Sequence, residues 1–394
     1  MYNKCFLYLE DKFNEMIKLW EELVNIDSGS SNKTGVDRVA KIICSELTKI
    51  GFDLEVLYFE NAGNSVLATK KGRERDVKIV LLGHMDTVFP EGTAGQRPFH
   101  IRNGRAYGPG VLDMKGGLVQ IIYALKALHH ISWEECSIQV ILAGDEEVGH
   151  VNTNVPDVIR QEAKGAAAVF CCESGRTDGK LVIGRKGVGK LKLTVYGKAA
   201  HAGNEPEKGA SAVLELASKI LKIQNLEDKS KGLTINTGII CGGSAVNVVP
   251  DRATAEIDVR FNNLKDFDEL KRRVLKLTDK REINGTRSEV IIRNTFPPME
   301  TTKGVLKLFD LVRETSIELG FGDIEKCTVG GGADSAYCVL SGAPVICAIG
   351  PRGGMNHSIE EFVEVESILE RTKLLTSCIM KIGSKKKYGG VKSD

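Results

Sequence analysis

Short apolar runs that alternate with helical patterns most strongly limit how this chain of 394 residues can fold. The apolar runs read "DLEVLYF", "VKIVLLG", "SIQVILAG" and "GAAAVFCC", and one helical pattern spans about residues 116 to 129. Such alternation is typical of an α/β sheet with helices on its faces. We expect this arrangement over residues 1–184.

The order of the predicted strands and helices changes after residue 184. Strand-like and helical segments then follow in the order β-α-β-β-α-β, which is the order of a ferredoxin-like split sandwich. We therefore predict a small α+β domain at 185–297, inserted into a larger domain made of residues 1–184 and 298–382. The basic segment 383–394, "GSKKKYGGVKSD", is expected to be a disordered tail.

Composition and charge argue against several classes of function. The 54 Lys and Arg residues nearly balance 52 Asp and Glu residues, so we expect neither nucleic acid nor a membrane as a partner. No run approaches the ~18 apolar residues of a membrane span, and the N-terminus lacks a signal-peptide core. The ten cysteines include no CxxC motif, so we expect reduced thiols and a cytoplasmic location.

Histidine and carboxylate residues follow the predicted strands. In "LLGHMDTV", His84 and Asp86 share one strand face at the carboxyl end, where open α/β sheets bind ligands. A histidine beside a carboxylate suits metal ligation, although a structural histidine would explain this pair equally well. Asp113 precedes a helix in "YGPGVLDMKGGL", where a helix cap is the simpler alternative.

Three adjacent carboxylates, Asp145, Glu146 and Glu147, come directly after the run "SIQVILAG". Adjacent carboxylates repel each other and are costly to hold together without cations, although a solvated loop would tolerate them. If a metal is present, one glutamate can coordinate the ion while its neighbour accepts a proton from water.

Two further residues, Glu173 in "FCCESG" and His357 in "GPRGGMNHSIEE", also follow apolar runs. Five strand-to-loop junctions therefore carry His, Asp or Glu, and helix caps alone explain this poorly. The carboxylates of Asp113, Glu147 and Glu173 would offset most of the charge of two divalent ions. The set contains no thiolate, which favours a catalytic dinuclear zinc site over a structural one.

These motifs resemble those of the co-catalytic zinc metallopeptidases. The family includes glutamate carboxypeptidase, aminoacylase, acetylornithine deacetylase and succinyl-diaminopimelate desuccinylase. The motifs of this chain are most similar to those of the glutamate carboxypeptidase type. The resemblance implies a zinc-exopeptidase-like domain with a mixed sheet flanked by helices, and an inserted ferredoxin-like domain that acts as lid and dimerisation module. The motifs, in the family's order, are "GHMDTV", "YGPGVLDMKGG", "GDEEVG", "ESG", "GKAAHAGNEPEKGASA", "GGSAVNVVPDRATAEIDVR", "GGGADSAY" and "NHS".

The resemblance also implies roles for individual residues. Glu146 is the general base and later the proton donor, and Asp86 orients His84. Two zinc ions per subunit, for which Co²⁺ or Mn²⁺ could substitute, share one bridging carboxylate. The implied ligands are His84, Asp113 and Glu173 for one ion, and Asp113, Glu147 and His357 for the other.

Three residues of the inserted domain complete the site that the resemblance implies. His201 enters the active site of the partner subunit in a homodimer and stabilises the oxyanion there; a turn histidine is the alternative. Asn247 and Arg260 help to hold the carboxylate of the substrate. For Arg260, a salt bridge with Asp258 is the alternative.

We predict a dizinc hydrolase that cleaves an amide bond next to a free α-carboxylate. A carboxypeptidase or dipeptidase with small peptide substrates is the first choice. An N-acyl amino acid deacylase or desuccinylase is the alternative with the same chemistry. A non-catalytic amino-acid or peptide binding protein is a more distant alternative, because such a relative should lack a ligand or the base.

Overall fold

The computed structural model describes residues 2–384, apart from the side chains of residues 75, 76 and 294. The chain divides into two compact units. The larger unit contains Met1–Ile183, Thr301–Thr328 and Ala333–Asp394, and the smaller unit contains Gly184–Glu300 and Val329–Gly332.

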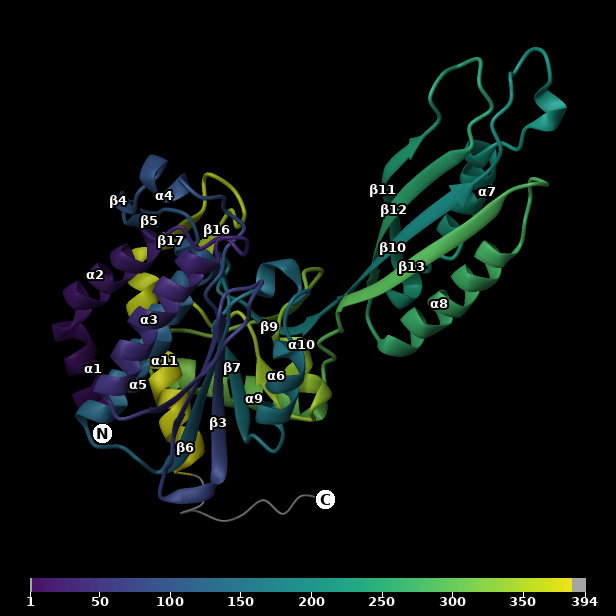
Figure 1. Cartoon of the computed structure of the whole chain (residues 1–394). Coiled ribbons are helices and arrows are strands. Elements are labelled where there is room, and N and C mark those ends of the chain that lie inside the picture. Colours follow the sequence, from purple (N-terminus) through teal and green to yellow (C-terminus); the bar gives the residue numbers. More distant parts are fainter. Residues whose placement is uncertain (1, 385–394) are drawn as a thin grey trace. The chain divides into compact units, whose positions relative to one another are not determined.

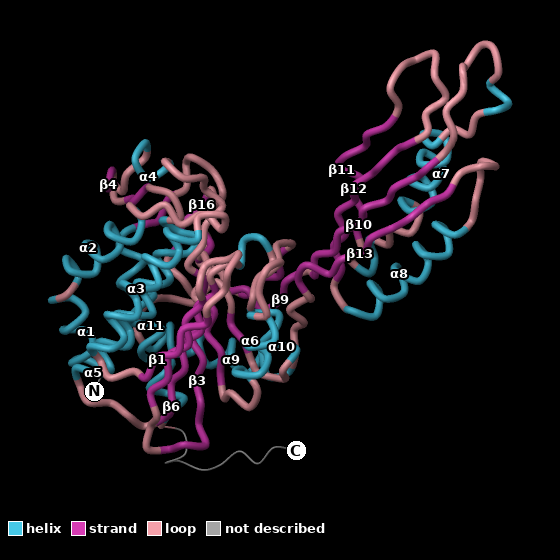
Figure 2. The backbone as a smooth tube through the Cα atoms, viewed as in Figure 1, coloured by secondary structure: helices cyan, strands magenta, loops and turns pink. Residues whose placement is uncertain are grey.

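A six-stranded mixed sheet forms the centre of the larger unit (Figures 1 and 2), with the strand order β1-β2-β6-β3-β7-β15. Its strands are β1 (Asp53–Leu57), β2 (Ser65–Lys70), β3 (Glu74–His84), β6 (Cys136–Ala143), β7 (Ala168–Cys171) and β15 (Val345–Ile346). Strands β3, β6, β7 and β15 run parallel to one another, whereas β1 and β2 run antiparallel to their neighbours. The predicted α/β fold with a mixed sheet is confirmed.

Helices cover this sheet on both faces (Figure 1). The helices of the larger unit are α1 (Tyr2–Asp11), α2 (Phe13–Val24), α3 (Lys33–Lys49), α4 (Thr93–Gln96), α5 (Gly116–His130), α6 (Val155–Ala163), α9 (Lys303–Glu318), α10 (Ser335–Leu340) and α11 (Val365–Gly383), of which α4 lies beside β4 rather than on the central sheet. On one face α5 and α11 pack against each other and against β3, and on the other α10 contacts α6 and β7. Within residues 2–384, no helix combines the length and apolar character that crossing a bilayer requires.

Strand β3 explains why functional groups collect at one edge of the sheet. Residues 79–82 are completely buried, as expected for a central parallel strand that is covered on both faces. Because β6 and β7 run parallel to β3, the three strands end at the same edge. Polar residues placed just after these strands are therefore brought close together.

A second, five-stranded sheet lies beside the first, with the order β4-β5-β17-β16-β8. Strands of two or three residues give no clear periodicity, so this sheet could not be predicted from the sequence. Its strands are β4 (His100–Arg102), β5 (Arg105–Tyr107), β8 (Gly175–Arg176), β16 (Arg352–Gly354) and β17 (Phe362–Glu364), and a separate pair joins β9 (Leu181–Arg185) to β14 (Lys326–Val329).

The smaller unit is a four-stranded antiparallel sheet with two helices on one face (Figure 1). Its strand order β11-β12-β10-β13 confirms the predicted ferredoxin-like topology. Along β10, Leu191, Leu193 and Val195 are buried against the helices while Lys190 and Lys192 face outward. The elements are β10 (Gly187–Tyr196), α7 (Ala212–Gln224), β11 (Thr234–Gly242), β12 (Arg252–Phe261), α8 (Leu264–Asp279) and β13 (Arg287–Phe296).

The bounds of the two units differ in detail from the predicted insertion at 185–297. Reciprocal backbone hydrogen bonds of 3.0 and 3.1 Å between Arg185 and Met299 keep the chain in the smaller unit beyond residue 297. The segment Val329–Gly332 also belongs to this unit, because Lys186 donates to the carbonyl of Val329 at 3.0 Å. At the C-terminus, α11 includes the first residue of the predicted tail, and residues 385–394 lie outside the described residues.

Candidate metal centre

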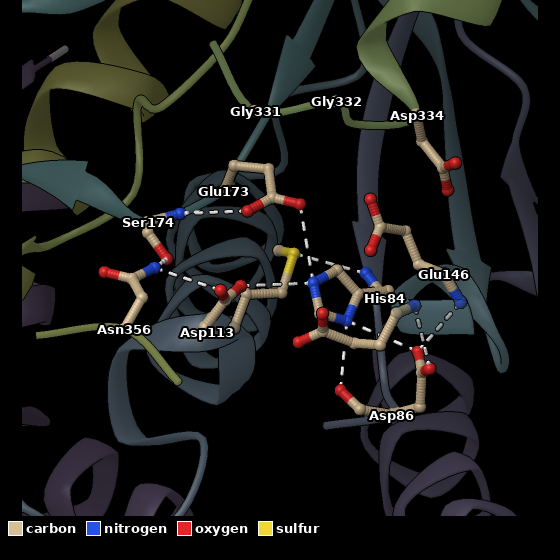
Figure 3. A network of polar contacts seen from close by, with 12 residues as sticks. His84, Asp86, Asp113, Glu146, Glu173, Ser174, Gly331, Gly332, Asp334 and Asn356 are labelled. Atoms are coloured by element: carbon tan, nitrogen blue, oxygen red, sulfur yellow. Dashed lines mark hydrogen bonds and ion pairs between the residues drawn. The ribbon is translucent and has the colours of Figure 1, made fainter. Parts of the chain in front are cut away.

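The predicted metal ligands of the larger unit meet at the carboxyl edge of the central sheet (Figure 3). His84 is the last residue of β3, and Glu173 follows β7 by two residues. Glu147 lies in the short turn Glu146–Val148 after β6. Asp113 comes from the turn Val111–Lys115 before α5, and His357 comes from the loop between β16 and β17.

The first group consists of His84, Asp113 and Glu173. The Nε2 atom of His84 lies 3.3 Å from Oδ1 of Asp113 and 3.4 Å from Oε1 of Glu173. Figure 3 shows both carboxylates directed toward the same side of the imidazole ring. One nitrogen and two carboxylate oxygens therefore surround a single point, as ligands of one ion would.

The second group uses the other oxygen of Asp113. Its Oδ2 atom lies 3.2 Å from Nε2 of His357, and that nitrogen lies 3.3 Å from Oε2 of Glu147. Each oxygen of Asp113 thus faces one histidine. The carboxylate of Asp113 therefore belongs to both groups, as expected for a residue that bridges two ions.

Asp86 is fully buried and supports both sides of the centre. The Nδ1 atom of His84 lies 3.0 Å from the Asp86 carbonyl oxygen and 3.4 Å from its Oδ1, so Nε2 is left facing the ligand carboxylates. The same carboxylate accepts the backbone N–H groups of Glu146 and Glu147, each at 3.1 Å. Asp86 therefore also fixes the turn after β6.

The charges of the centre fit divalent cations. Burial alone would raise the pKa of Asp113, but hydrogen bonds from His357 and His84 hold it well below its usual range. Burial would lower the pKa of His84, yet hydrogen bonds to Asp113, Asp86 and Glu173 raise it well above its ordinary value. Hydrogen bonds to Asp113 and then Glu147 raise the pKa of His357 to about 10. Positive charge is thus strongly favoured at both imidazoles, where metal ions would supply it.

The pKa values of Glu146 and Glu147 also indicate that a positive charge belongs beside these two carboxyl groups. Burial raises the pKa of Glu147 to about 7 despite the hydrogen bond from His357, and its Oε1 atom is buried with no hydrogen-bond partner. Burial also raises the pKa of Glu146 well above its ordinary value, while His84 opposes the rise. Glu173 and Asp334 add to it. An orphaned, buried carboxylate oxygen in a set of N and O donors fits a bound metal.

Glu361 is a residue that sequence analysis missed. It is fully buried, and its Oε1 accepts the N–H groups of Leu112 and Asp113 at 2.8 and 2.9 Å. Its Oε2 accepts the N–H of Gly110 at 3.2 Å. Burial, followed by the charge of Asp113, raises its pKa to about 7. Glu361 therefore fixes the turn that presents the shared carboxylate.

A buried chain of three side chains was also missed. His150 lies between Asp145, at 2.8 Å from Nδ1, and Asp334, at 2.7 Å from Nε2. The sequence analysis gave this histidine no role in the site. Asp334 belongs to the motif "GGGADSAY" and points toward Glu146 in Figure 3. The chain ties the turn after β6 to the start of α10.

Two predicted residues of the smaller unit are neighbours. His201 pairs with Val248 in an isolated β-bridge, and Ala202 donates to the carbonyl of Asn247 at 3.0 Å. The Nδ1 atom of His201 accepts two backbone N–H groups, from Gly203 and Asn204, each at 3.1 Å. Because Nδ1 is an acceptor, the proton of the neutral ring lies on Nε2, which makes Nε2 a donor.

Arg260 is held by partners within the smaller unit. Its Nε and Nη2 donate to the two carboxylate oxygens of Asp258 at 2.8 and 3.1 Å, and its Nη1 donates to Gly330 at 3.2 Å. This is the salt bridge that the sequence offered as the alternative. The predicted contacts of His201, Asn247 and Arg260 with substrate stay predictions.

A histidine–carboxylate centre at the carboxyl edge of a mixed sheet defines the class of protein: an α/β protein with a candidate dinuclear metal centre. Comparison with known proteins narrows this class. The family model described as Peptidase family M20/M25/M40 matches residues 80–381. The chain is 33% identical to carboxypeptidase G2 of Pseudomonas sp. (strain RS-16) over 395 residues, covering 98% of this chain and 93% of that protein.

One further relative by sequence and one solved structure are also similar to this chain. The chain is 28% identical over 364 residues to succinyl-diaminopimelate desuccinylase of Nitrosomonas eutropha, covering 88% of this chain and 93% of that protein. The structure of a tripeptidase from Staphylococcus aureus shares the fold, with a TM-score of 0.79, 20% identity, and coverage of 94% of this chain and 98% of that one. The chain belongs to peptidase family M20/M25/M40 and is a metal-dependent hydrolase of amide bonds, which confirms the resemblance noted in its motifs.

Proposed function

We propose that the protein is a dizinc exopeptidase that cleaves a small peptide at an amide bond next to a free α-carboxylate. The observation that carries this proposal is the position of Asp113, whose two oxygens face His84 at 3.3 Å and His357 at 3.2 Å. A carboxylate shared in this way suits a pair of ions rather than one. The identity with carboxypeptidase G2 supports a carboxypeptidase-like substrate.

Zinc is the metal that the ligand spacing favours. A tetrahedral Zn²⁺ with ligands at ~2.0–2.1 Å keeps neighbouring ligand atoms roughly 3.3 Å apart. In the two groups the corresponding N–O separations are 3.3, 3.4, 3.2 and 3.3 Å. Co²⁺ or Mn²⁺ are expected to replace Zn²⁺ in part, because nitrogen and oxygen ligands accept all three ions.

When bound, the metal ions polarise the scissile carbonyl and make water more acidic. Glu146 accepts the proton of the attacking water at its carboxylate and then delivers it to the leaving nitrogen. Burial raises its pKa above the ordinary value, which makes the carboxylate a stronger base toward the attacking water. The carboxylate of Asp86 keeps Glu146 in position by accepting the backbone N–H of Glu146.

His201 is proposed to complete the site of a partner subunit in a homodimer formed through the smaller unit. A donor is needed beside the carbonyl oxygen as negative charge develops on it. The hydrogen bonds that His201 Nδ1 accepts from Gly203 and Asn204 support this role, because they leave Nε2–H free to donate. Asn247, on the adjacent loop, and Arg260 are proposed to hold the substrate carboxylate. For Arg260 this requires that a guanidinium already paired with Asp258 also contacts substrate.

An N-acyl amino acid deacylase or desuccinylase is the second candidate. The identity with succinyl-diaminopimelate desuccinylase favours it, since that relative is also covered over most of its length. Both candidates use the same metal centre and the same base. They differ in the group on the acyl side of the cleaved bond.

A substrate panel separates the two candidates. The zinc-loaded protein should hydrolyse dipeptides and tripeptides faster than N-acetyl or N-succinyl amino acids, as measured by release of free amino acid. Turnover of N-acyl amino acids without turnover of any peptide would overturn the peptidase proposal. Glu146→Gln is the matched control: it should retain its metal and lose about 10²–10⁴ in kcat.

A cytoplasmic location is proposed from the state of the thiols. Free thiols persist in reducing compartments, whereas secreted proteins of many cysteines commonly form disulfides. Thiols without a disulfide are present at Cys5, Cys44, Cys136, Cys172, Cys241, Cys338 and Cys378.

A further inference from the structure

A cavity of about 480 Å³ lies in the larger unit, apart from the two metal groups. Its walls are the hairpin of β4 and β5, the loop between β16 and β17, and the side chain of Arg97. Cavities of roughly 300–1,000 Å³ are typical of small-molecule sites. The cavity is therefore large enough for part of a small peptide.

One face of the hairpin is strongly basic. His100 and Arg102 share a face of β4, and Arg105 and Tyr107 share a face of β5, because each pair is two residues apart. The register sets His100 opposite Tyr107 and Arg102 opposite Arg105, and all four residues line the cavity. Like charges directly opposite each other destabilise a sheet. A counter-ion in the cavity would remove that cost.

The arginines of the cavity lack carboxylate partners. In the part of the chain that the structure describes, Arg97, Arg102 and Arg105 form no ion pair, although Glu360 also lines the cavity. Both terminal nitrogens of Arg97 are buried without a hydrogen-bond partner. Buried guanidinium N–H groups are costly unless an acceptor pairs with them. The cavity is thus arranged for an anion.

Aromatic rings hold the basic groups in place. The guanidinium of Arg105 lies 4.2 Å from the ring centroid of Phe362, and that of Arg97 lies 5.2 Å from the ring of Phe89. Both distances suit cation–π contacts. Such contacts orient a guanidinium before a ligand arrives, which reduces the entropy lost on binding.

The cavity and the metal centre share one loop. Met355, Ile359 and Glu360 line the cavity, and His357 of the second metal group lies between them in sequence. Gly108 also lines the cavity, five residues before the shared ligand Asp113. A ligand in the cavity therefore lies against the same loop that carries a proposed metal ligand.

We propose that this cavity binds carboxylate groups on the acyl side of the substrate, so that acidic peptides are the preferred substrates. The proposal rests on the proposed peptidase function. Arginine suits this role because its planar fork pairs with both oxygens of a carboxylate. The cavity is assigned to the residues that precede the cleaved bond because it lies against the loop that carries His357, within the larger unit.

Paired substrates test the preference. We expect kcat/KM for Glu-Glu-Ala to exceed that for Gln-Gln-Ala by at least about tenfold, equivalent to one well-formed charged contact. Arg97→Gln and Arg105→Gln should each reduce this ratio to about threefold or less. Arg38→Gln, which alters an exposed arginine that does not line the cavity, should keep the wild-type ratio. Equal hydrolysis of the two peptides by the wild-type protein would overturn the proposal.

Equilibrium binding separates the cavity from catalysis. The metal-free protein should bind the unreactive peptide D-Glu-D-Glu more tightly than D-Gln-D-Gln in calorimetry, and Arg105→Gln should weaken that binding at least about tenfold. Tighter binding of inorganic phosphate than of D-Glu-D-Glu would assign the cavity to a different anion and overturn the proposal. If no peptide is cleaved but D-Glu-D-Glu still binds, the peptidase function fails and the cavity's carboxylate site stands. If peptides are cleaved without preference and D-Glu-D-Glu does not bind, the cavity proposal alone fails.

Discussion

The carboxylate of Asp86 accepts the backbone N–H of Glu146 at 3.1 Å, which ties the end of β3 to the turn that presents the proposed base. The second oxygen accepts the N–H of Glu147 at 3.1 Å and the hydroxyl of Ser30 at 2.7 Å. One buried carboxylate thus positions a proposed metal ligand, the proposed base and, through its contact with His84, a second proposed metal ligand. This arrangement fixes the position of the proposed base relative to the proposed metal ligands.

Asp86→Asn should therefore reduce activity without preventing folding. An amide has a single acceptor oxygen, so one of the N–H groups of Glu146 and Glu147 would face an NH₂ group instead. We expect kcat to fall about 10–100-fold while the thermal midpoint changes little. Steady-state kinetics together with metal content by mass spectrometry would measure this. Ser30→Ala removes only one donor and should cost much less, and an unchanged kcat in Asp86→Asn would contradict the assigned role.

Glu361→Gln should weaken metal binding rather than catalysis by the bound metal. The glutamine amide would oppose the N–H of either Gly110 or Leu112, which loosens the turn that holds Asp113. We expect about tenfold weaker metal affinity, measured by competition with a chromogenic chelator. Glu366→Gln changes an exposed glutamate of α11 and serves as the matched control. Equal metal affinity in the two variants would show that Glu361 acts on the fold alone.

The proposed metal ligands could be picked out from the sequence because each of them sits at a strand end or a glycine-rich turn. "IVLLG" is a continuous apolar run, so His84, which follows it, marks the end of a buried strand, and β3 ends at that residue. Parallel strands then bring Glu147 and Glu173 to the same edge by topology alone. No such rule exposes Glu361, which stands in the polar segment "NHSIEE" and looks like a solvated residue until its burial is known.

Contacts between distant segments were the part that could not be predicted. His150 and Asp334 are 184 positions apart, and no local pattern links a glycine-flanked histidine to the start of α10. The basic cavity was hidden for a related reason, because the register that sets Arg102 opposite Arg105 belongs to strands of only three residues. Arg260 and Asp258 lie two residues apart on β12, so their pairing was visible as an alternative.

Metal removal should destabilise the larger unit. Asp113, Glu146, Glu147 and Glu173 are mostly buried, and ions that bind only the folded state add to its stability. At free Zn²⁺ about 100-fold above its dissociation constant, the expected gain is about 2.7 kcal/mol in the free energy of unfolding. Calorimetry of chelated and zinc-loaded protein measures this. Asp113→Asn should lose most of the zinc-dependent gain, and an equal gain in that variant would contradict the shared-ligand role.

His150 should stabilise the fold in a pH-dependent way. Burial opposes its charge, but Asp334 and Asp145 raise its pKa well above 6.5. Its contribution is therefore complete below about pH 6.5, declines as pH rises from there, and is lost once pH passes the folded-state pKa. The difference in unfolding free energy between wild type and His150→Gln should shrink between pH 6 and pH 9 in urea titrations. A difference that grows with pH would contradict a charged His150.

The proposed dimer makes a prediction about mixed subunits. His201→Ala and Glu146→Gln chains should each be inactive, because the first cannot lend a histidine and the second lacks the base. After subunit exchange, a heterodimer has one site with an intact Glu146 and an intact His201 from the other chain. With random pairing, about a quarter of the wild-type activity should return. Activity assays after exchange, followed with differently tagged chains, measure this. Exchange without recovery would contradict a histidine supplied by the partner subunit.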